Sequence, residues 1–294
     1  MSADCNDRIT VVVLTHNRSA ELCRSLERLL ALPEQPSIIV VDNGSADGTV
    51  ENVTAGLPRV RLVRSESNLG AAGRNLGVEC VRTPYVAFSD DDTWWAPGAL
   101  CNAVELLDRH PRIAVLNARI VVGPEARADP ACDAMEESPL GHLANVGPML
   151  TGFMAGAVVM RADAYRQAGG YWHALFIGGE EALLAMDILD AGGQIVYAPT
   201  LQVHHWPSQS RDSMLRRRLT ARNAIWTAWL RLPWRLAWQR TARTLKALPD
   251  SALRWRVLGE SLSGAGLILR RRRVLHRDTC ELLERVWRSE TRPR

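Results

Sequence analysis

Three carboxylates occur in a row at Asp90, Asp91 and Asp92, directly after the apolar run 84–88. The run predicts a buried strand, and acidic side chains at its end repel one another unless a cation or strong donors lie between them. Proteins hold Mg²⁺ with one or two carboxylates together with substrate phosphates. The cluster therefore predicts a metal–diphosphate site, and a solvated acidic turn is the alternative.

Further polar side chains and glycines follow the other apolar runs. Asp42 can accept hydrogen bonds from a nucleobase or ribose, and Gly70 and Gly73 let a ligand approach the backbone closely. Arg74 can pair with a phosphate or brace the metal-binding carboxylates. The carboxyl ends of parallel strands share one edge of a sheet, where open α/β folds bind ligands.

The elements that must position these residues alternate between strand and helix, which predicts an α/β fold with a doubly wound, mostly parallel sheet. The expected strands cover 9–14, 38–41, 60–63, 84–88, 113–122 and 194–197, and the expected helices cover 19–31, 47–56, 70–80, 98–109 and 180–191. Residues 123–150, rich in Pro, Gly and acids, are expected to form a loop insertion or flap.

Composition narrows the class of protein. The chain has 294 residues, of which 47% are hydrophobic, and it contains no uncharged apolar run long enough to span a membrane. Its N-terminal residues lack the basic and apolar regions of a signal peptide, and its six cysteines form no CxxC pair. These features predict a cytoplasmic protein with reduced thiols, without a disulfide framework or a zinc site.

Charge divides the chain into two regions. Residues 1–210 have a net charge of −10, whereas residues 211–294 have a net charge of +14 and hold six of the ten tryptophans. This asymmetry predicts two functional regions, one over 1–210 and a basic, Trp-rich helical extension over 211–294 that meets an anionic surface.

The extension has two interpretations. An amphipathic helix carrying interleaved Trp and Arg, with Leu215, Leu219, Ile225, Trp226 and Trp229 on one face, is typical of a bilayer interface, and 270–273 adds four arginines suited to anionic lipid. The enzyme would then be peripheral on the inner face of the membrane. Alternatively, the tryptophans pack onto the catalytic domain and the arginines are solvated. Nucleic-acid binding is disfavoured, because the neighbouring acidic domain would oppose it.

The motifs together resemble those of a family 2 glycosyltransferase with the GT-A fold. The similarity covers about 8–208 and rests on 13–18, 40–45, 47–49, 68–70, 74–75, 90–92, 178–181 and 197–199, with His204 or His205. The resemblance implies transfer of a sugar from a nucleotide-diphosphate donor with inversion at the anomeric carbon. UDP, dTDP and GDP donors all suit these motifs.

The resemblance also implies roles in donor binding. Thr15, Asn17 and Asp42 would line the nucleoside pocket, and Asp90 and Asp92 would be the outer pair of the family's Asp-x-Asp element. Asp92 would contact Mn²⁺ or Mg²⁺, and Asp90 would lie nearer the ribose or a metal-bound water. Asp91 belongs to the same donor-binding element, with its side chain expected to point away as a structural residue.

An inverting transfer needs one base to deprotonate the acceptor hydroxyl. By the same resemblance Glu181 is the predicted base and Glu180 would orient the acceptor, while complementing the helix dipole is the alternative for both. Asp187 departs from the family, whose members often carry Arg there.

Two pairs of aromatic residues complete the expected site. His204 or its neighbour His205 would complete the metal shell, which Mn²⁺ tolerates better than Mg²⁺, and ordinary loop histidines are the alternative. Trp94 and Trp95 would stack on an acceptor sugar, or else serve only in packing.

We therefore expect a glycosyltransferase that builds a polysaccharide, a glycolipid or a glycosylated natural product on a saccharide, lipid-linked or small-molecule acceptor. Transfer to a polyprenyl phosphate, which needs no strong base, is one alternative. A non-catalytic nucleotide-sugar-binding scaffold is another.

Overall fold

The computed structural model describes residues 5–207 and 213–290. Its first half alternates strands β1 (Ile9–Thr15), β2 (Ser37–Asp42), β3 (Val60–Arg64) and β4 (Tyr85–Asp90) with helices α1 (Ser19–Leu30), α2 (Thr49–Gly56) and α3 (Gly73–Cys80). Strand β5 (Thr93–Trp95), helix α4 (Ala99–Arg109) and strand β6 (Ile113–Val122) follow. The predicted alternation is confirmed, because apolar runs such as 11–13 are wholly buried as strands.

The central sheet is mixed but mostly parallel in its N-terminal half, as predicted. Its strand order is β3-β2-β1-β4-β10-β6-β11-β9-β8. β1 lies parallel to β2 and β4, while β10 (Val158–Arg161) runs antiparallel between β4 and β6. This arrangement places the ends of β1, β2 and β4 at one edge of the sheet.

Residues 123–150 are more ordered than predicted. They contain β7 (Arg127–Ala128), α5 (Pro130–Glu136), β8 (His142–Leu143) and β9 (Gly147–Leu150), and helix α6 (Ala162–Gln167) follows β10. The late strand β11 (Gln194–His205) is 12 residues long and follows α7 (Glu180–Asp190). β7 pairs with β6, β9 pairs with β11 and β8 pairs with β9, so pairing with strands elsewhere in the chain orders this Pro- and Gly-rich segment.

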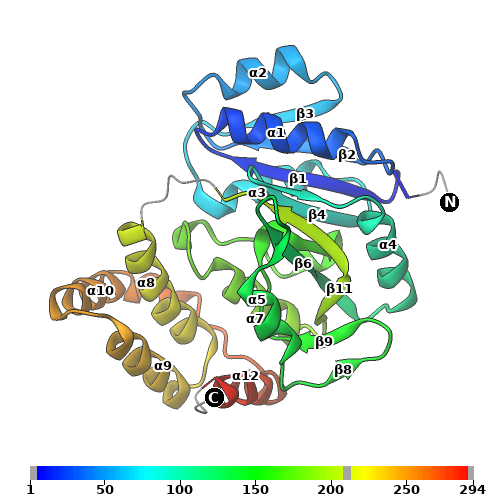
Figure 1. Cartoon of the computed structure of the whole chain (residues 1–294). Helices are drawn as coiled ribbons and strands as arrows, with labels where there is room; N and C mark the ends of the chain where they lie inside the picture. The colour runs from blue at the N-terminus through cyan, green and yellow to red at the C-terminus, as the bar shows by residue number, and fades with distance from the viewer. Residues whose placement is uncertain (1–4, 208–212, 291–294) are drawn as a thin grey trace.

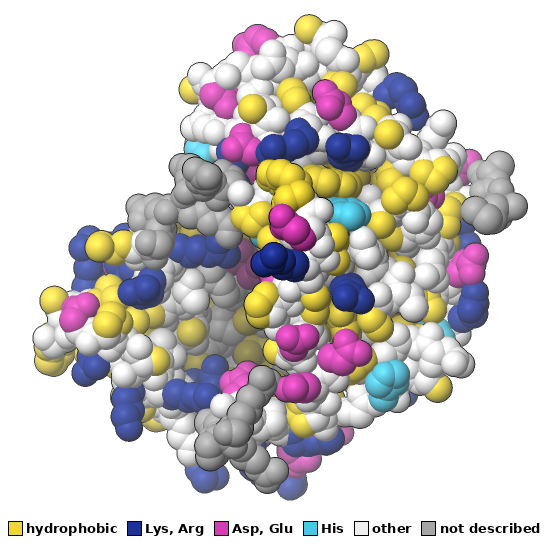
Figure 2. All heavy atoms as spheres, viewed as in Figure 1, with side chains coloured by type: hydrophobic (Ala, Val, Ile, Leu, Met, Phe, Trp, Pro, Cys, Tyr) yellow, Lys and Arg dark blue, Asp and Glu magenta, His cyan; other side chains and the backbone are white. Residues whose placement is uncertain are grey.

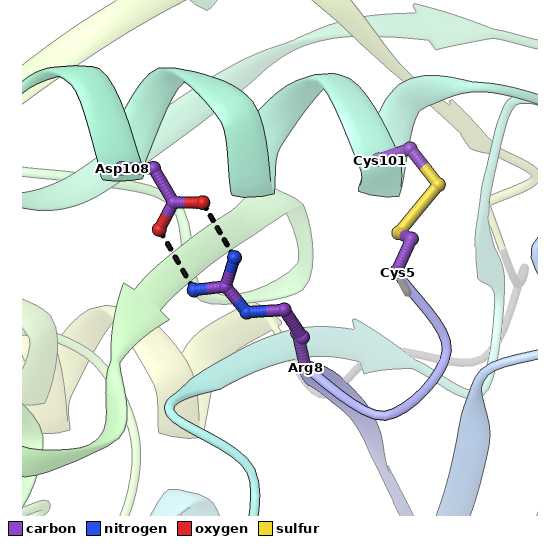
Figure 3. The surroundings of a disulfide bond; sticks show 4 residues. All are labelled: Cys5, Arg8, Cys101 and Asp108. Atoms are coloured by element: carbon purple, nitrogen blue, oxygen red, sulfur yellow. Dashed lines mark hydrogen bonds and ion pairs between the residues drawn. A yellow bond between two sulfur atoms is a disulfide. The ribbon is translucent and has the colours of Figure 1, made fainter. Parts of the chain in front are cut away.

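One disulfide corrects the expectation that all cysteines are reduced. Cys5 and Cys101 are joined with their Cα atoms 5.6 Å apart, which ties the segment before β1 to α4 (Figure 3). Beside it, Arg8 makes two hydrogen bonds to Asp108 of the same helix. The two cysteines are 96 residues apart, so their pairing depends on the fold and could not be read from spacing.

The C-terminal region is helical, as predicted. It comprises α8 (Ser213–Arg231), α9 (Trp234–Ala247), α10 (Ser251–Ser263), α11 (Ala265–Arg270) and α12 (Arg277–Ser289), which gather on one side of the sheet, away from α1 and α2 (Figure 1). Pro233 separates α8 from α9, as its missing N–H requires. The predicted boundary at 210 lies outside the described residues. Across the described part of the chain, no helix is both long and apolar enough to cross a bilayer.

The side chains proposed for a bilayer interface are largely used internally. Trp226 is buried with its indole N–H donating to the Ser261 carbonyl, and Trp229 donates to the Thr241 hydroxyl. In the 270–273 cluster, Arg272 bonds to backbone carbonyls of 229 and 232, and Arg273 pairs with Asp187. Leu219, Ile225 and Trp226 of the helical face named for the membrane are therefore buried in protein, whereas Leu215 is exposed. Other tryptophans, Trp234, Trp238 and Trp255, are exposed instead.

Candidate active site

The ends of β1, β2 and β4 bring the predicted donor-binding residues to one edge of the sheet. Thr15 lies opposite Asp42 in the β1–β2 register, and Leu14 lies opposite Asp90 in the β1–β4 register. The edge borders a cavity of about 570 Å³. The parallel register alone therefore explains why residues 75 positions apart in the chain line one site.

The three consecutive aspartates point to different partners. Asp90 pairs with the buried Arg74, and its own side chain remains 41% exposed. Asp91 is buried, accepting hydrogen bonds from the Thr15 hydroxyl at 3.1 Å and from Arg18 at 3.0 Å. Asp92 lies 3.7 Å from Arg18 and 3.7 Å from the His205 ring. Arg74 beside Asp90, and Arg18 between Asp91 and Asp92, offset part of the mutual repulsion, which still acts to raise the pKa of Asp91.

Burial strongly affects the charges in this cluster. It raises the pKa of Asp91 to about 7, although the nearby Arg18 opposes the shift. Burial acts to lower the pKa of Arg74, but the charges of Asp90, Tyr171, Glu180 and Glu181 together outweigh it and hold that pKa above its ordinary value. Asp91 is thus a buried internal group, in line with the structural role expected for it.

Glu180 and Glu181 line the same cavity as the aspartates. They begin α7, and burial raises the pKa of Glu180 to about 7, with the charge of Glu181 adding to the shift. Burial also raises the pKa of Glu181, against the charge of Arg74. One buried Glu180 oxygen has no hydrogen-bond partner within the described structure. Burial thus shifts the pKa of both carboxyls upward, and a carboxyl with a raised pKa is a stronger base for removing a proton from a hydroxyl.

The loop before α7 is fixed by close backbone contacts. The Ala71 N–H donates to the Phe176 carbonyl at 2.7 Å, and Gly70 has φ +61°. A Cβ on Gly70 would lie 2.1 Å from that carbonyl oxygen, so only glycine fits. This contact joins the donor edge, which is the edge of the sheet at the ends of β1, β2 and β4, to the segment that carries Glu180 and Glu181.

Not all predicted donor residues reach the cavity. Asp42 is wholly buried, accepts a hydrogen bond from the Ser45 N–H and lies 3.3 Å from the Arg64 side chain. Asn17 is exposed and accepts a hydrogen bond from the Ala46 N–H. Both stabilise the turn after β2, beside the cavity.

Three aromatic predictions are not supported by the geometry. His204 stacks on Trp94 with ring centroids 5.5 Å apart, and burial lowers its pKa, whereas His205 on the other face of β11 lines the cavity. His205 therefore replaces His204 as the histidine beside Asp92. Trp95 is fully buried in the core, so its predicted role in stacking on an acceptor sugar is wrong. Trp94, packed on His204, also lies outside the cavity lining.

Among the residues that line the cavity, Arg18, Asn43, Asn68 and Arg216 had been given no role in the predicted site. Asn43 donates to Asn68 and to the Gly70 carbonyl, both at 2.9 Å, and so ties the end of β2 to the next loop. Arg18, Asn43 and Asn68 belong to motifs that were noticed, so their signal was present. Arg216 lies on α8, where only the tertiary structure could place it.

The cavity contains side chains that can serve as ligands of a divalent ion. Asp92 and His205 face each other, and Asp90 exposes its carboxylate to the same cavity. Within residues 5–207 and 213–290, no three His, Cys, Asp or Glu side chains form a complete metal cage. Two or three protein ligands, completed by water and a diphosphate, match the way Mg²⁺ is bound, and the imidazole suits Mn²⁺.

Fold, site and sequence together define the class. Residues 10–168 match Glycosyl transferase family 2, so the chain belongs to this family. Among curated relatives, the N-acetylglucosaminyl-diphospho-decaprenol L-rhamnosyltransferase of Mycobacterium tuberculosis is 26% identical over 69% of this chain and 78% of its own length. The pre-mycofactocin glycosyltransferase of the same organism is 29% identical over 71% of this chain and 45% of its own length.

Solved structures confirm the GT-A fold. The mannosyltransferase PcManGT from Pyrobaculum calidifontis, in complex with GDP-Man and Mn²⁺, superposes with a TM-score of 0.59 at 18% identity, over 95% of this chain and 84% of its own. S. aureus TarS 1-349 in complex with UDP-GlcNAc gives 0.60 at 16% identity, over 87% of this chain and 71% of its own. At such identities the likeness concerns the fold alone.

Proposed function

We propose that this glycosyltransferase moves a sugar from a nucleotide-diphosphate donor to an acceptor hydroxyl with inversion, using Mn²⁺ or Mg²⁺. The observation that carries the proposal is that Asp90, Asp92, Glu180 and Glu181 line one cavity. A single displacement requires support for the leaving diphosphate and one base for the acceptor hydroxyl, and the cavity offers a pair of carboxylates for each task. Complexes of GT-A relatives with UDP-GlcNAc and with GDP-Man and Mn²⁺ support this donor class.

The residues divide the work between leaving group and nucleophile. Asp92, with His205 and Asp90, would hold the ion, which when bound neutralises charge that develops on the departing diphosphate. Arg74 fixes Asp90, and Arg18 fixes Asp91 and so the shape of the turn. Glu181 accepts the acceptor proton, and Glu180 orients the acceptor. Two relatives are named for lipid-linked or small-molecule acceptors, and we propose a lipid-linked or growing saccharide acceptor here.

Donor hydrolysis tests this proposal without a known acceptor, because water replaces the acceptor hydroxyl. UDP-, dTDP- and GDP-sugars are incubated with the purified protein and Mn²⁺, and the released nucleotide is measured. Glu181→Gln should lower turnover at least about 100-fold, the usual contribution of a general base. Asp92→Asn should lower it and raise the Mn²⁺ concentration needed.

The matched control is Glu51→Gln, an exposed carboxylate on α2 far from the cavity. Equal turnover in wild type, control and both site variants would contradict the catalytic assignment and favour a scaffold. Full transfer by Glu181→Gln to a phosphate acceptor would favour the polyprenyl-phosphate alternative. The anomeric configuration of the product, read by NMR, tests inversion.

A further inference from the structure

A second cavity of about 570 Å³ lies between α8 and α9. Arg216 and Arg217 of α8 and Arg240 and Arg243 of α9 line it, and Glu290 is the one carboxylate among the described residues of the lining. We call this cavity the arginine groove. Figure 2 shows Lys and Arg side chains gathered at the left of the view, over the region of α8, α9 and α10.

The arginines of the groove are mostly not neutralised by the protein. Arg216 and Arg217 are exposed and make no ion pair with any described residue. Arg243 lies 3.7 Å from Glu290, and Arg240 stacks on Trp287 at 4.2 Å. Burial and the charge of Arg243 lower the pKa of Arg240. Four guanidiniums around one carboxylate leave a site that an anion would stabilise.

The groove adjoins the catalytic cavity at Arg216. This side chain lines both cavities, and its charge acts to lower the pKa of Glu180 and of Glu181. An anion held by the arginines is therefore next to the carboxylates that would handle an acceptor. The remaining wall is small and apolar, with Ala221, Ala224 and Leu248.

We propose that the arginine groove binds the phosphate or diphosphate of an anionic acceptor, an inference that rests on the proposed function. Arginine presents a planar fork that matches phosphate oxygens, and the four guanidiniums exceed what one carboxylate can balance. The apolar wall accommodates the first carbons attached to the phosphate. The acceptor hydroxyl then lies on the side of Glu181.

Calorimetric titration of the full chain tests the groove directly. The probes are pyrophosphate, farnesyl diphosphate below its micellar concentration, and farnesol. EDTA is present throughout, because arginines need no metal whereas the donor site is expected to. Both diphosphates should bind and farnesol should not.

The test variant is Arg217→Gln/Arg243→Gln, because these exposed side chains line the groove and not the catalytic cavity. We expect affinity for both diphosphates to fall about tenfold or more. The matched control is Arg59→Gln/Arg61→Gln, which removes the same net charge. Arg59 lies directly before β3 and Arg61 lies within it, and both are exposed. Unchanged thermal unfolding of both variants shows that they fold.

Failure to bind either diphosphate, or equal affinity of test and control variants, would overturn the groove. If the diphosphates bind only with Mn²⁺, their binding site is the catalytic cavity, and the proposal for the groove is wrong as well. Tighter binding of farnesyl diphosphate than of pyrophosphate supports a lipid-linked acceptor, and equal binding supports a soluble phosphorylated one. Donor hydrolysis by the wild-type protein is measured separately. Its absence would reject the proposed function but would not change the result of the binding test for the groove.

Discussion

The donor edge of the sheet and the C-terminal helices are held together in different ways. The sheet is part of one extensive apolar core that runs from β1 to β11, and its polar site residues are fixed by buried hydrogen bonds such as Thr15 to Asp91. The helices form three small apolar clusters, and two of these include residues of the catalytic half, namely Leu175, Leu183 and Met186. The helices therefore depend on the catalytic half for their own cores.

The dependence also runs in the other direction. The buried Asn223 of α8 donates to the carbonyls of Leu175, Ile177 and Gly178, at 2.7, 3.1 and 2.7 Å. These carbonyls belong to the loop that leads into Glu180. The extension is thus a support for the acceptor-side carboxylates, whereas the donor edge supports itself.

The largest expected effect tests this support. Asn223→Leu keeps the approximate volume but removes the side-chain donor of the Ile177 and Gly178 carbonyls, while the Leu175 carbonyl keeps the Ile177 N–H. We therefore expect the free energy of unfolding to fall by about 3 kcal/mol. Urea unfolding measures the change, and donor hydrolysis should fall with it because the loop carries Glu180. The control is Asn52→Leu on α2, which loses one exposed hydrogen bond to Ser19 and should cost under about 1 kcal/mol. Equal losses in the two variants would contradict the difference between the regions.

An intermediate effect is expected at the ion pairs that attach the extension. Asp187 accepts two hydrogen bonds from Arg231, at 2.6 and 2.9 Å, and one from Arg273 at 2.5 Å. Asp187→Asn would leave the largely buried Arg231 without its charge partner, which should cost about 2 kcal/mol, less than for a fully buried pair. Urea unfolding and faster proteolysis of α8–α12 would report the loss.

The matched control for Asp187 is Glu281→Gln, which breaks an exposed pair with Arg277 on α12. Such pairs contribute little, so we expect a change within about 0.5 kcal/mol. If Asp187→Asn lowered the free energy of unfolding no more than Glu281→Gln does, the extension would be held by its apolar clusters alone.

The smallest expected effect concerns pH at the junction of the two regions. Because Glu180 and Glu181 have raised pKa values, the protonated pair cannot accept a proton, and donor hydrolysis should rise by up to about tenfold per unit as the pH approaches 7 and then level off. The native state binds these protons more tightly than the unfolded state, so stability should fall as the pH rises from the ordinary Glu value towards 7. Glu180→Gln should weaken this stability profile, and an unchanged profile would show that the pair does not cause it.

The sequence by itself determined the donor edge. Apolar runs of strand length, each ending in polar residues such as Thr15 and Asp90, require a parallel sheet with those residues on one edge, because strand direction fixes where each carboxyl end lies. The two acidic elements and the helical extension were predictable for the same local reason.

Only the tertiary structure decided which side chains face the cavity and what the extension does. His204 and His205 are adjacent, and the β11 pleat sends them to opposite faces, so the pairing with β5 and β6 chooses between them. Cys5 meets Cys101, and Asn223 meets the loop before α7, through contacts between residues far apart in the chain. Such contacts depend on how whole elements pack, which no local pattern of residues specifies.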